Sequence, residues 1–421
     1  KKRMAINFTA LKWQTRHHLN KLILDPRSFF GVLYGCVAIV WISFVARSML
    51  HTPPGGWCDA PTSWLTTSGE NVSALPVDVE FSGKLRFMSI WTTATDFSER
   101  HMRSVESIFF HHPDARLFVY SNELATDALR TVTDLGYDAQ VVRYDLAELL
   151  VGTPAEPWLE HLDKWKRGPY YYSHVTDAMR MALLFREGGV YMDTDVIVVR
   201  PFVIAREPPS PPPPRQPAGS RLPVRRPPIV PVDRTPRAIQ PHTVGAESHT
   251  INDIPVCNGA IMVFARGSRF LWGAMREFAQ TYRDYEWGWN GPELLTRVRR
   301  KCPHDVSVLL EDRFYPFHWE EVDTYSTSGS PSEQVAMWNL IQNRSYAAHL
   351  WNRKSDEIPL ADTSVYFKLL NSFRLNGKKA PAAAAATAAG AGANRRLDSH
   401  ITQEQADEQI KAKKAEGAVL R

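Results

Sequence analysis

A helix, a pair of glycines, a short strand and two closely spaced aspartates follow one another in the middle of this chain, and this order constrains the fold more than any other feature. Residues 170–186 have the apolar spacing of a helix, and the glycines at 188–189 predict its end. Residues 190–192 predict a strand that leads into the Asp-Thr-Asp of 193–195, and 196–199 are apolar again. A helix that returns directly into a buried strand is typical of α/β domains.

The preceding residues continue the same alternation. Apolar runs predict strands at 85–91, 116–120 and 140–144, with helices at 97–110 and 123–135 between them. Strands that alternate with helices indicate an α/β domain with a mainly parallel central sheet.

Asp193 and Asp195 are the candidate catalytic and metal-binding residues. Two carboxylates at the carboxyl end of a buried strand are costly unless a positive group lies against them. A hard divalent cation, Mn²⁺ or Mg²⁺, is the simplest such group, and it would neutralise a diphosphate leaving group. This interpretation fails if both side chains point away from any cavity or are already neutralised by lysine or arginine.

Asp177 and Arg180 lie three residues apart on the predicted helix, on a different flank from the apolar face of Val175, Met179 and Ala182. Their side chains either form a surface ion pair or point into a cleft. An apolar run before Asp-x-Asp is also the opening of haloacid-dehalogenase-type phosphatases, whose first aspartate is a nucleophile. That motif normally begins its domain, whereas an α/β pattern precedes it here.

Residues 28–46 carry no charged side chain and suit a helix that crosses a hydrocarbon core of ~30 Å. A core helix would show a polar face, and a cleaved signal peptide has a shorter apolar core. Basic residues dominate 1–27, so the positive-inside rule predicts a cytosolic N-terminus and a lumenal remainder. The predicted organisation is a cytosolic tail (1–27), a signal anchor (28–46), a stem (47–83), a catalytic domain (84–375) with a proline-rich insertion (207–240), and an Ala-rich and charged tail (376–421).

Composition excludes several classes. A chain that is 44% hydrophobic and 23% charged is neither wholly disordered nor fibrous, and a net charge of +5 gives no nucleic-acid footprint. Four cysteines exclude a disulfide scaffold. In a lumen, Cys58, Cys257 and Cys302 allow one bridge whose pairing the sequence leaves open, and Asn71 and Asn343 begin glycosylation triplets.

The motif Asp177-x-x-Arg180, followed by the glycine pair, Tyr191 and Asp193-Thr-Asp195, resembles the sugar-binding region of glycosyltransferase family 32, a GT-A family that uses nucleotide-sugars. The segments 258–264, 287–297, 314–316 and 349–355 resemble the conserved region of the alpha-1,4 galactosyl- and N-acetylglucosaminyltransferase group. The proline-rich insertion and the Ala-rich tail depart from that pattern.

The resemblance implies roles for individual residues. Read alone, the histidine beside Trp351 predicts a packed core residue, the tryptophans a structural turn, and the asparagine at the start of a strand a turn cap. The roles implied are metal ligation by Asp193, Asp195 and His349, donor binding by Asp177, Arg180, Tyr191, Asn258 and Gly259, and acceptor binding by Trp287, Trp289 and Asn290.

The expected activity is transfer of a hexose from UDP-galactose or UDP-N-acetylglucosamine to a glycolipid or glycan, with retention and in an alpha-1,4 linkage, by a type II Golgi membrane protein that can form a homodimer and binds no nucleic acid. A mannosyl- or glucosyltransferase acting on inositol-phosphoceramide or N-glycans is the alternative within the fold. A catalytically silent lumenal lectin or scaffold is the alternative from another class. No carboxylate can be named as nucleophile from spacing.

Overall fold

The structure, a computed structural model, describes residues 56–59, 81, 83–93, 97–205, 238–250 and 253–381. The chain divides into two compact units, Lys1–Trp57 and Cys58–Arg421, and every helix and strand given below belongs to the second. The predicted cytosolic tail, the anchor at 28–46, and most of the stem, the insertion and the C-terminal tail lie outside the described residues. Among the residues that are described, no helix combines the length and apolarity needed to span a bilayer.

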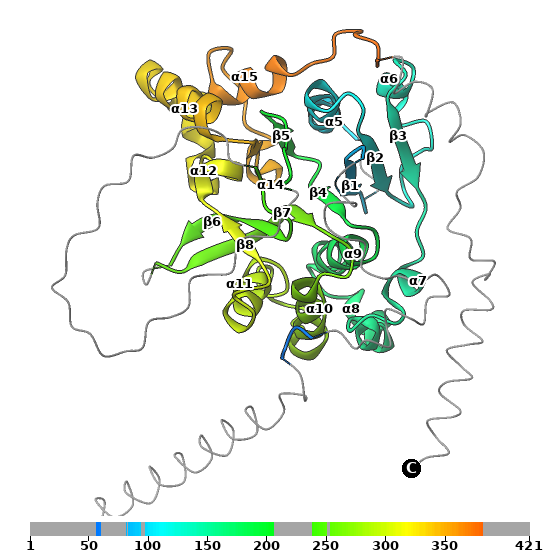
Figure 1. Ribbon diagram of the computed structural model, residues 1–421. Coiled ribbons are helices and arrows are strands. Elements are labelled where there is room, and N and C mark those ends of the chain that lie inside the picture. The colour runs from blue at the N-terminus through cyan, green and yellow to red at the C-terminus, as the bar shows by residue number, and fades with distance from the viewer. Residues whose placement is uncertain are drawn as a thin grey trace, which may run out of the picture. The chain divides into compact units, whose positions relative to one another are not determined.

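A seven-stranded sheet with the order β3-β2-β1-β4-β7-β6-β8 forms the centre of this unit (Figure 1). The first four of these strands run parallel to one another, β7 runs antiparallel to β4 and β6, and β8 is parallel to β6. The predicted α/β class with a mainly parallel sheet is therefore confirmed. The strands are β1 (Arg86–Ile90), β2 (Arg116–Tyr120), β3 (Asp138–Val142), β4 (Gly189–Met192), β6 (Thr243–His249), β7 (Pro255–Phe264) and β8 (Ser307–Leu309).

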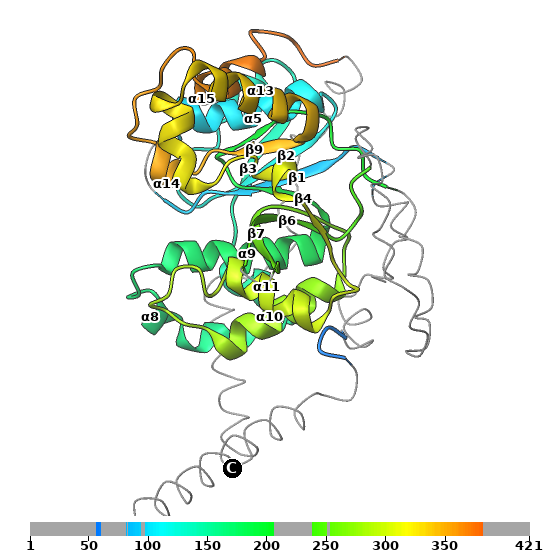
Figure 2. The same ribbon diagram turned by 90° about the vertical axis from the view of Figure 1, so that its left-hand side faces the viewer.

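Helices cover both faces of the sheet, as Figure 2 shows. This gives three layers with apolar side chains packed between them. One layer contains α5 (Glu99–His111), α13 (Pro331–Arg344), α14 (Asn352–Ser355) and α15 (Val365–Ser372), with α12 (Glu311–Phe314) beside them. The other contains α8 (Leu162–Trp165), α9 (Tyr171–Glu187), α10 (Arg269–Thr281) and α11 (Pro292–Lys301). Shorter elements are α6 (Arg130–Thr133), α7 (Leu146–Leu150), η1 (Glu156–His161), η2 (Trp319–Glu321) and η3 (Thr324–Ser328).

A second, two-stranded sheet positions the site. It pairs β5 (Val196–Val198) antiparallel with β9 (Ala347–His349), and Val196 is the register partner of His349. This register places the last residue of β9 beside Asp195, which directly precedes β5.

The end of α9 agrees with the prediction. Gly188 has a φ of 61° and its N–H donates to the carbonyl oxygen of Leu184, 2.9 Å away, which ends the helix. Gly189 has a φ of 117°, and a Cβ there would lie 2.6 Å from the carbonyl oxygen of Arg86 on β1. The glycine pair is thus required both for the turn and for the close packing of β4 on β1.

One predicted helix is wrong in most of its length. The range 123–135 contains only α6, because side chains hold the residues before it in turns. Ser121 Oγ accepts hydrogen bonds from the N–H groups of Glu123 and Leu124, and Arg143 donates to the carbonyl oxygens of Ser121 and Leu124. These side-chain bonds replace the backbone bonds of a helix.

The cysteine pairing that the sequence left open is Cys58 with Cys302. Cys257 is free and buried. The bridge attaches a described segment near the start of this unit to the end of α11.

Candidate active site

The Asp-Thr-Asp turn connects β4 of the large sheet to β5 of the small one. The Asp193 N–H donates to the carbonyl oxygen of Ala260 on β7, 2.8 Å away, and the Asp195 carbonyl oxygen accepts from the N–H of Leu350, also at 2.8 Å. The turn is therefore fixed to both sheets. The side chains of Asp193 and Asp195 are 27% and 16% exposed, so both carboxylates remain in reach of solvent.

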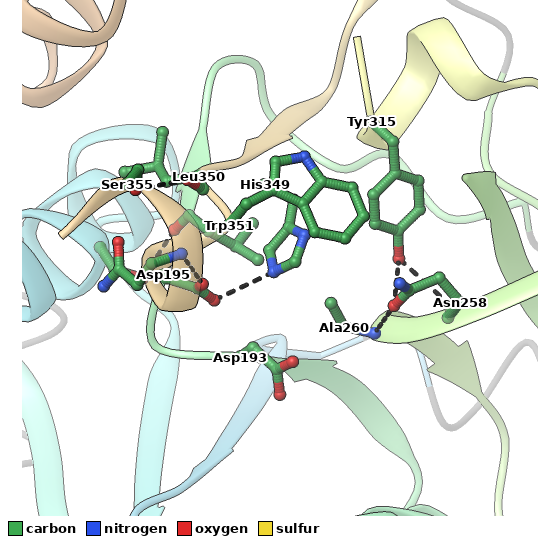
Figure 3. Close-up of polar contacts among 12 residues, drawn as sticks. Asp193, Asp195, Asn258, Ala260, Tyr315, His349, Leu350, Trp351 and Ser355 are labelled. Carbon is green, nitrogen blue, oxygen red and sulfur yellow. Dashed lines mark hydrogen bonds and ion pairs between the residues drawn. The ribbon is translucent and has the colours of Figure 1, made fainter. Parts of the chain in front are cut away.

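His349, for which the resemblance implies metal ligation, lies against Asp195 (Figure 3). Its Nε2 is 3.2 Å from Asp195 Oδ1, and the N–H of Asn352 donates to Asp195 Oδ2 at 2.9 Å. Burial disfavours charge on both partners, but their mutual attraction outweighs it. The pKa of Asp195 is lowered, and that of His349 is raised.

Asp193, Asp195 and His349 together fit a divalent cation. One ligand atom from each lies within 4.8 Å of the others. The His349 Nδ1 is buried and has no hydrogen-bond partner within the described part of the chain. Two carboxylate oxygens and one imidazole nitrogen are donors that Mn²⁺ accepts, and the predicted metal residues are thus brought together.

Arg180 already lies against one of the two aspartates, which is a correction to the sequence interpretation. Its Nη1 is 3.4 Å from Asp193 Oδ1, its Nη2 is 3.5 Å from Asp177 Oδ1, and Nη1 donates to the carbonyl oxygen of Gly259 at 2.6 Å. Neutralisation is incomplete, because three carboxylates here face one guanidinium and one imidazole. An added dication still has a net negative site to bind.

Asp177 is held close to the start of α11. A Cβ at Gly291, the residue before that helix, would lie 2.8 Å from Asp177 Oδ2. Burial raises the pKa of Asp177 to about 6, although Arg180 opposes the shift. The expected Asp177–Arg180 pair therefore exists, but as part of a buried network and not as a surface ion pair.

Tyr191 is fully buried on β4, and its hydroxyl donates to Asp193 Oδ1 at 2.6 Å. The Arg180 guanidinium lies over its ring, 4.7 Å from the centroid. These contacts hold the Asp193 carboxylate in one orientation.

Asn258 is similarly engaged by its neighbours. Its Nδ2 donates to Glu247 Oε2 at 2.6 Å, and its Oδ1 accepts from the N–H of Ala260 at 2.7 Å. The Tyr315 hydroxyl donates to the Asn258 carbonyl oxygen at 3.2 Å. Asn258 thus connects Glu247, Ala260 and Tyr315 to one another beside the site. The donor contact that the resemblance implies for Asn258 stays a prediction.

Tyr315 and Glu247 were not found as site residues from the sequence. Tyr315 lies within the 314–316 motif, which contributed to the resemblance, but no role was assigned to its residues. Glu247, whose pKa is raised by burial, belongs to no recognised motif.

The three predicted acceptor residues have different surroundings. Trp289 is stacked between Arg283 and Arg297, with guanidinium carbons 3.4 and 3.8 Å from its ring centroid. The amide of Asn290, which is 1% exposed, bonds both backbone groups of Arg283. Trp287 is 48% exposed. Trp289 and Asn290 therefore hold the turn together, and Trp287 is the one available for stacking.

Trp351 has an unusual backbone next to the site. Its φ of 53° is rare for an aromatic residue, and its ring lies 4.2 Å from that of His349. Strain of this kind persists only where the surroundings impose it, and it is common at functional sites. The turn that it makes starts α14 and directs the Asn352 N–H at Asp195.

Two family models match the regions that contain these residues. Residues 98–212 match a glycosyltransferase sugar-binding region containing a DXD motif, and residues 263–373 match an alpha 1,4-glycosyltransferase conserved region. The first region contains Asp177 to Asp195 and the second contains His349, whereas Glu247 and Asn258 lie between them.

Named relatives align with half or more of the chain. A lactosylceramide 4-alpha-galactosyltransferase of Rattus norvegicus is 29% identical over 320 residues, covering 69% of this chain and 76% of that protein. An alpha-1,4-N-acetylglucosaminyltransferase of Homo sapiens is 27% identical over 230 residues, covering 51% and 52%. Among solved structures, the WbbM bifunctional glycosyltransferase aligns with a TM-score of 0.39 and 10% identity over 70% of this chain and 50% of that one.

Proposed function

The chain belongs to the glycosyltransferases that combine a DXD sugar-binding region with the alpha 1,4-glycosyltransferase conserved region, and from this we propose that it transfers a hexose from a nucleotide-sugar to a glycolipid or glycan. The proposed donor is UDP-galactose or UDP-N-acetylglucosamine, the proposed linkage is alpha-1,4, and the anomeric configuration is retained. The activities after which the rat and human relatives are named support this choice.

One observation carries the proposal. The ligand atoms of Asp193, Asp195 and His349, from two different strand pairs, converge within 4.8 Å. Two of these residues lie in one matched region and the third lies in the other, so the fold joins the two regions at one point.

In the proposed mechanism, Asp193, Asp195 and His349 would hold Mn²⁺, which would neutralise charge on the departing nucleoside diphosphate as a Lewis acid. The chain's own groups prepare that site. The Asn352 N–H and His349 fix the two oxygens of Asp195, while Tyr191 and Arg180 fix Asp193. All four contacts come from the chain itself, so the two carboxylates need little reorganisation when the cation and donor bind.

The cellular setting is part of the proposal. Residues 28–46 act as a single-pass type II anchor in the Golgi membrane, with the catalytic unit in the lumen. The bond between Cys58 and Cys302 supports an oxidising compartment.

The test is a donor screen with the purified chain. UDP-galactose, UDP-N-acetylglucosamine, UDP-glucose and GDP-mannose are each assayed for hydrolysis and for transfer, with Mn²⁺ or with EDTA. We expect Mn²⁺-dependent turnover of one of the two proposed UDP-sugars, and the anomeric proton coupling in NMR of the product should show retention. Preference for GDP-mannose or UDP-glucose would favour the alternative substrates instead.

A single substitution tests the metal site. Asp195→Asn removes one charge while leaving an oxygen for the Asn352 N–H, so turnover should fall by at least about 100-fold without loss of far-ultraviolet circular dichroism. Asp356→Asn is the matched control, because this aspartate is 60% exposed and pairs only peripherally with Arg100. Full activity in Asp195→Asn would refute the metal role. Calorimetry that detects no Mn²⁺-dependent UDP binding by the unmodified chain would favour a silent lectin or scaffold.

A further inference from the structure

A row of aromatic rings leads from His349 to the surface. The ring centroids of His349 and Trp351 are 4.2 Å apart, those of Trp351 and His318 are 6.3 Å apart, and those of His318 and Trp319 are 5.1 Å apart. Exposure rises along the row. His349 and Trp351 are each 7% exposed, the His318 side chain is 30% exposed, and Trp319 is 40% exposed. We refer to these four residues as the aromatic row.

The outer end of the row is next to a cation. The Lys354 Nζ lies 5.2 Å from the centroid of Trp319, and Lys354 belongs to α14, the helix that begins at the turn holding Asp195. The adjacent Arg353 lies 5.5 Å from the centroid of Trp287. Two exposed tryptophans, Trp319 at the start of η2 and Trp287 in the turn before α11, are thus both next to α14 beside the metal ligands.

An exposed indole next to a cation provides the two kinds of contact that protein surfaces use to bind a sugar. The apolar face of a sugar ring stacks on an aromatic face, and a neighbouring ammonium donates hydrogen bonds to the hydroxyl groups. Trp319 was not singled out in the sequence, because it stands between His318 and Glu320, outside the motifs at 314–316 and 349–355.

A second tryptophan–lysine pair in the same chain shows what a structural pair looks like. Trp338 of α13 has the Lys368 Nζ 6.0 Å from its centroid, but its ring packs against the hydrophobic core. Trp319 instead counts among the exposed large hydrophobic residues. Packing accounts for the position of Trp338, whereas the Trp319 ring is exposed beside a cation and at the end of a row of rings that starts at His349.

We propose that Trp319 and Lys354 form an outer acceptor subsite, which binds a sugar residue beyond the one that receives the transferred hexose. This inference rests on the proposed function and deepens it. The acceptor is then an oligosaccharide chain of at least two sugar residues, and the enzyme reads the second residue through Trp319, three ring-to-ring steps from His349.

The experiment compares a short and a long acceptor with the full chain, the donor selected by the screen, and Mn²⁺. Methyl β-galactoside and lactose are the probes, and kcat/KM is measured for both. In the unmodified chain, lactose should be the better acceptor. Trp319→Ala should lower the lactose to methyl β-galactoside ratio of kcat/KM about 5- to 10-fold, the size expected for the loss of one stacking contact. Trp319→Phe should restore part of the ratio, and Trp338→Ala should leave it unchanged.

Binding provides a readout that does not need turnover. Saturation-transfer NMR of lactose with the full chain, UDP and Mn²⁺ should show the signals of the glucose unit in the unmodified chain and lose them selectively in Trp319→Ala and Lys354→Met. An unchanged acceptor ratio together with unchanged lactose signals in Trp319→Ala overturns the subsite. Absence of any nucleotide-sugar turnover in the unmodified chain refutes the proposed function instead, and the lactose signals then decide the subsite by themselves.

Discussion

Arg180 separates two interpretations of this site, a buried counter-ion and a donor-binding residue, and Arg180→Met distinguishes them. The guanidinium lies 3.4 Å from Asp193 Oδ1 and 3.5 Å from Asp177 Oδ1, and its side chain is 10% exposed. Removing one partner of a buried ion pair costs about 3–5 kcal/mol, because the other charge is left unpaired. The 27% exposure of Asp193 lets water offset part of this, so we expect a loss of about 3 kcal/mol in the free energy of unfolding.

Thermal unfolding followed by circular dichroism measures this loss. For a unit of this size, about 3 kcal/mol corresponds to a fall in Tm of about 4 °C. Mn²⁺ should recover part of the fall, since the cation replaces the lost positive charge beside Asp193. Arg269→Met is the matched control, because Arg269 also faces two carboxylates, Asp59 and Asp305, but is 57% exposed, and surface pairs contribute about 0–1 kcal/mol. An unchanged Tm in Arg180→Met, together with lost donor binding, would refute the counter-ion interpretation.

Two further outcomes follow from groups away from the site. His112 accepts a hydrogen bond from the N–H of Phe202, and burial lowers its pKa to about 4. The neutral form is favoured in the native state, so its stabilising contribution is present above about pH 6.5 and is lost as pH falls toward 4. In urea titrations, the free energy of unfolding should fall between pH 7 and pH 5 by about 2 kcal/mol less in His112→Asn than in the unmodified chain. Replacing Cys58 and Cys302 by serine opens a loop with a sequence separation of 244 residues and should lower the free energy of unfolding by about 4 kcal/mol in urea titrations, whereas a change below about 1 kcal/mol would contradict this.

Much of the sheet could be predicted from the sequence because its strands are short apolar runs bounded by residues that end helices and strands. The range 116–120 is β2 residue for residue, and the Gly188-Gly189 stop of α9 is where the pattern placed it. The helix at 123–135 could not be corrected from local pattern, because the competing hydrogen bonds come from Arg143, which lies on the far side of β3 in the sequence. Tertiary contacts of this kind override propensity.

The candidate site likewise contains residues that the sequence predicted and residues that it could not predict. The aspartate pair carries its own signal, and His349 was reached through a resemblance, since a lone histidine beside a tryptophan is otherwise a packing residue. The partnership of Arg180 with Asp193 could not be foreseen, because it depends on how α9 packs across β4 and β7. Glu247 gave no signal either, since its contact with Asn258 is set by the irregular pairing of β6 with β7.

The pairing of β5 with β9 has a consequence for biosynthesis. Val196 and His349 are register partners, yet most of the catalytic unit is synthesised between them. A nascent chain that has emerged only as far as β8 holds both aspartates but lacks the imidazole and the backbone amide of Asn352 that complete their surroundings. The proposed metal site is therefore complete only once residues 347–352 have been synthesised, and a product truncated before β9 is expected to be inactive.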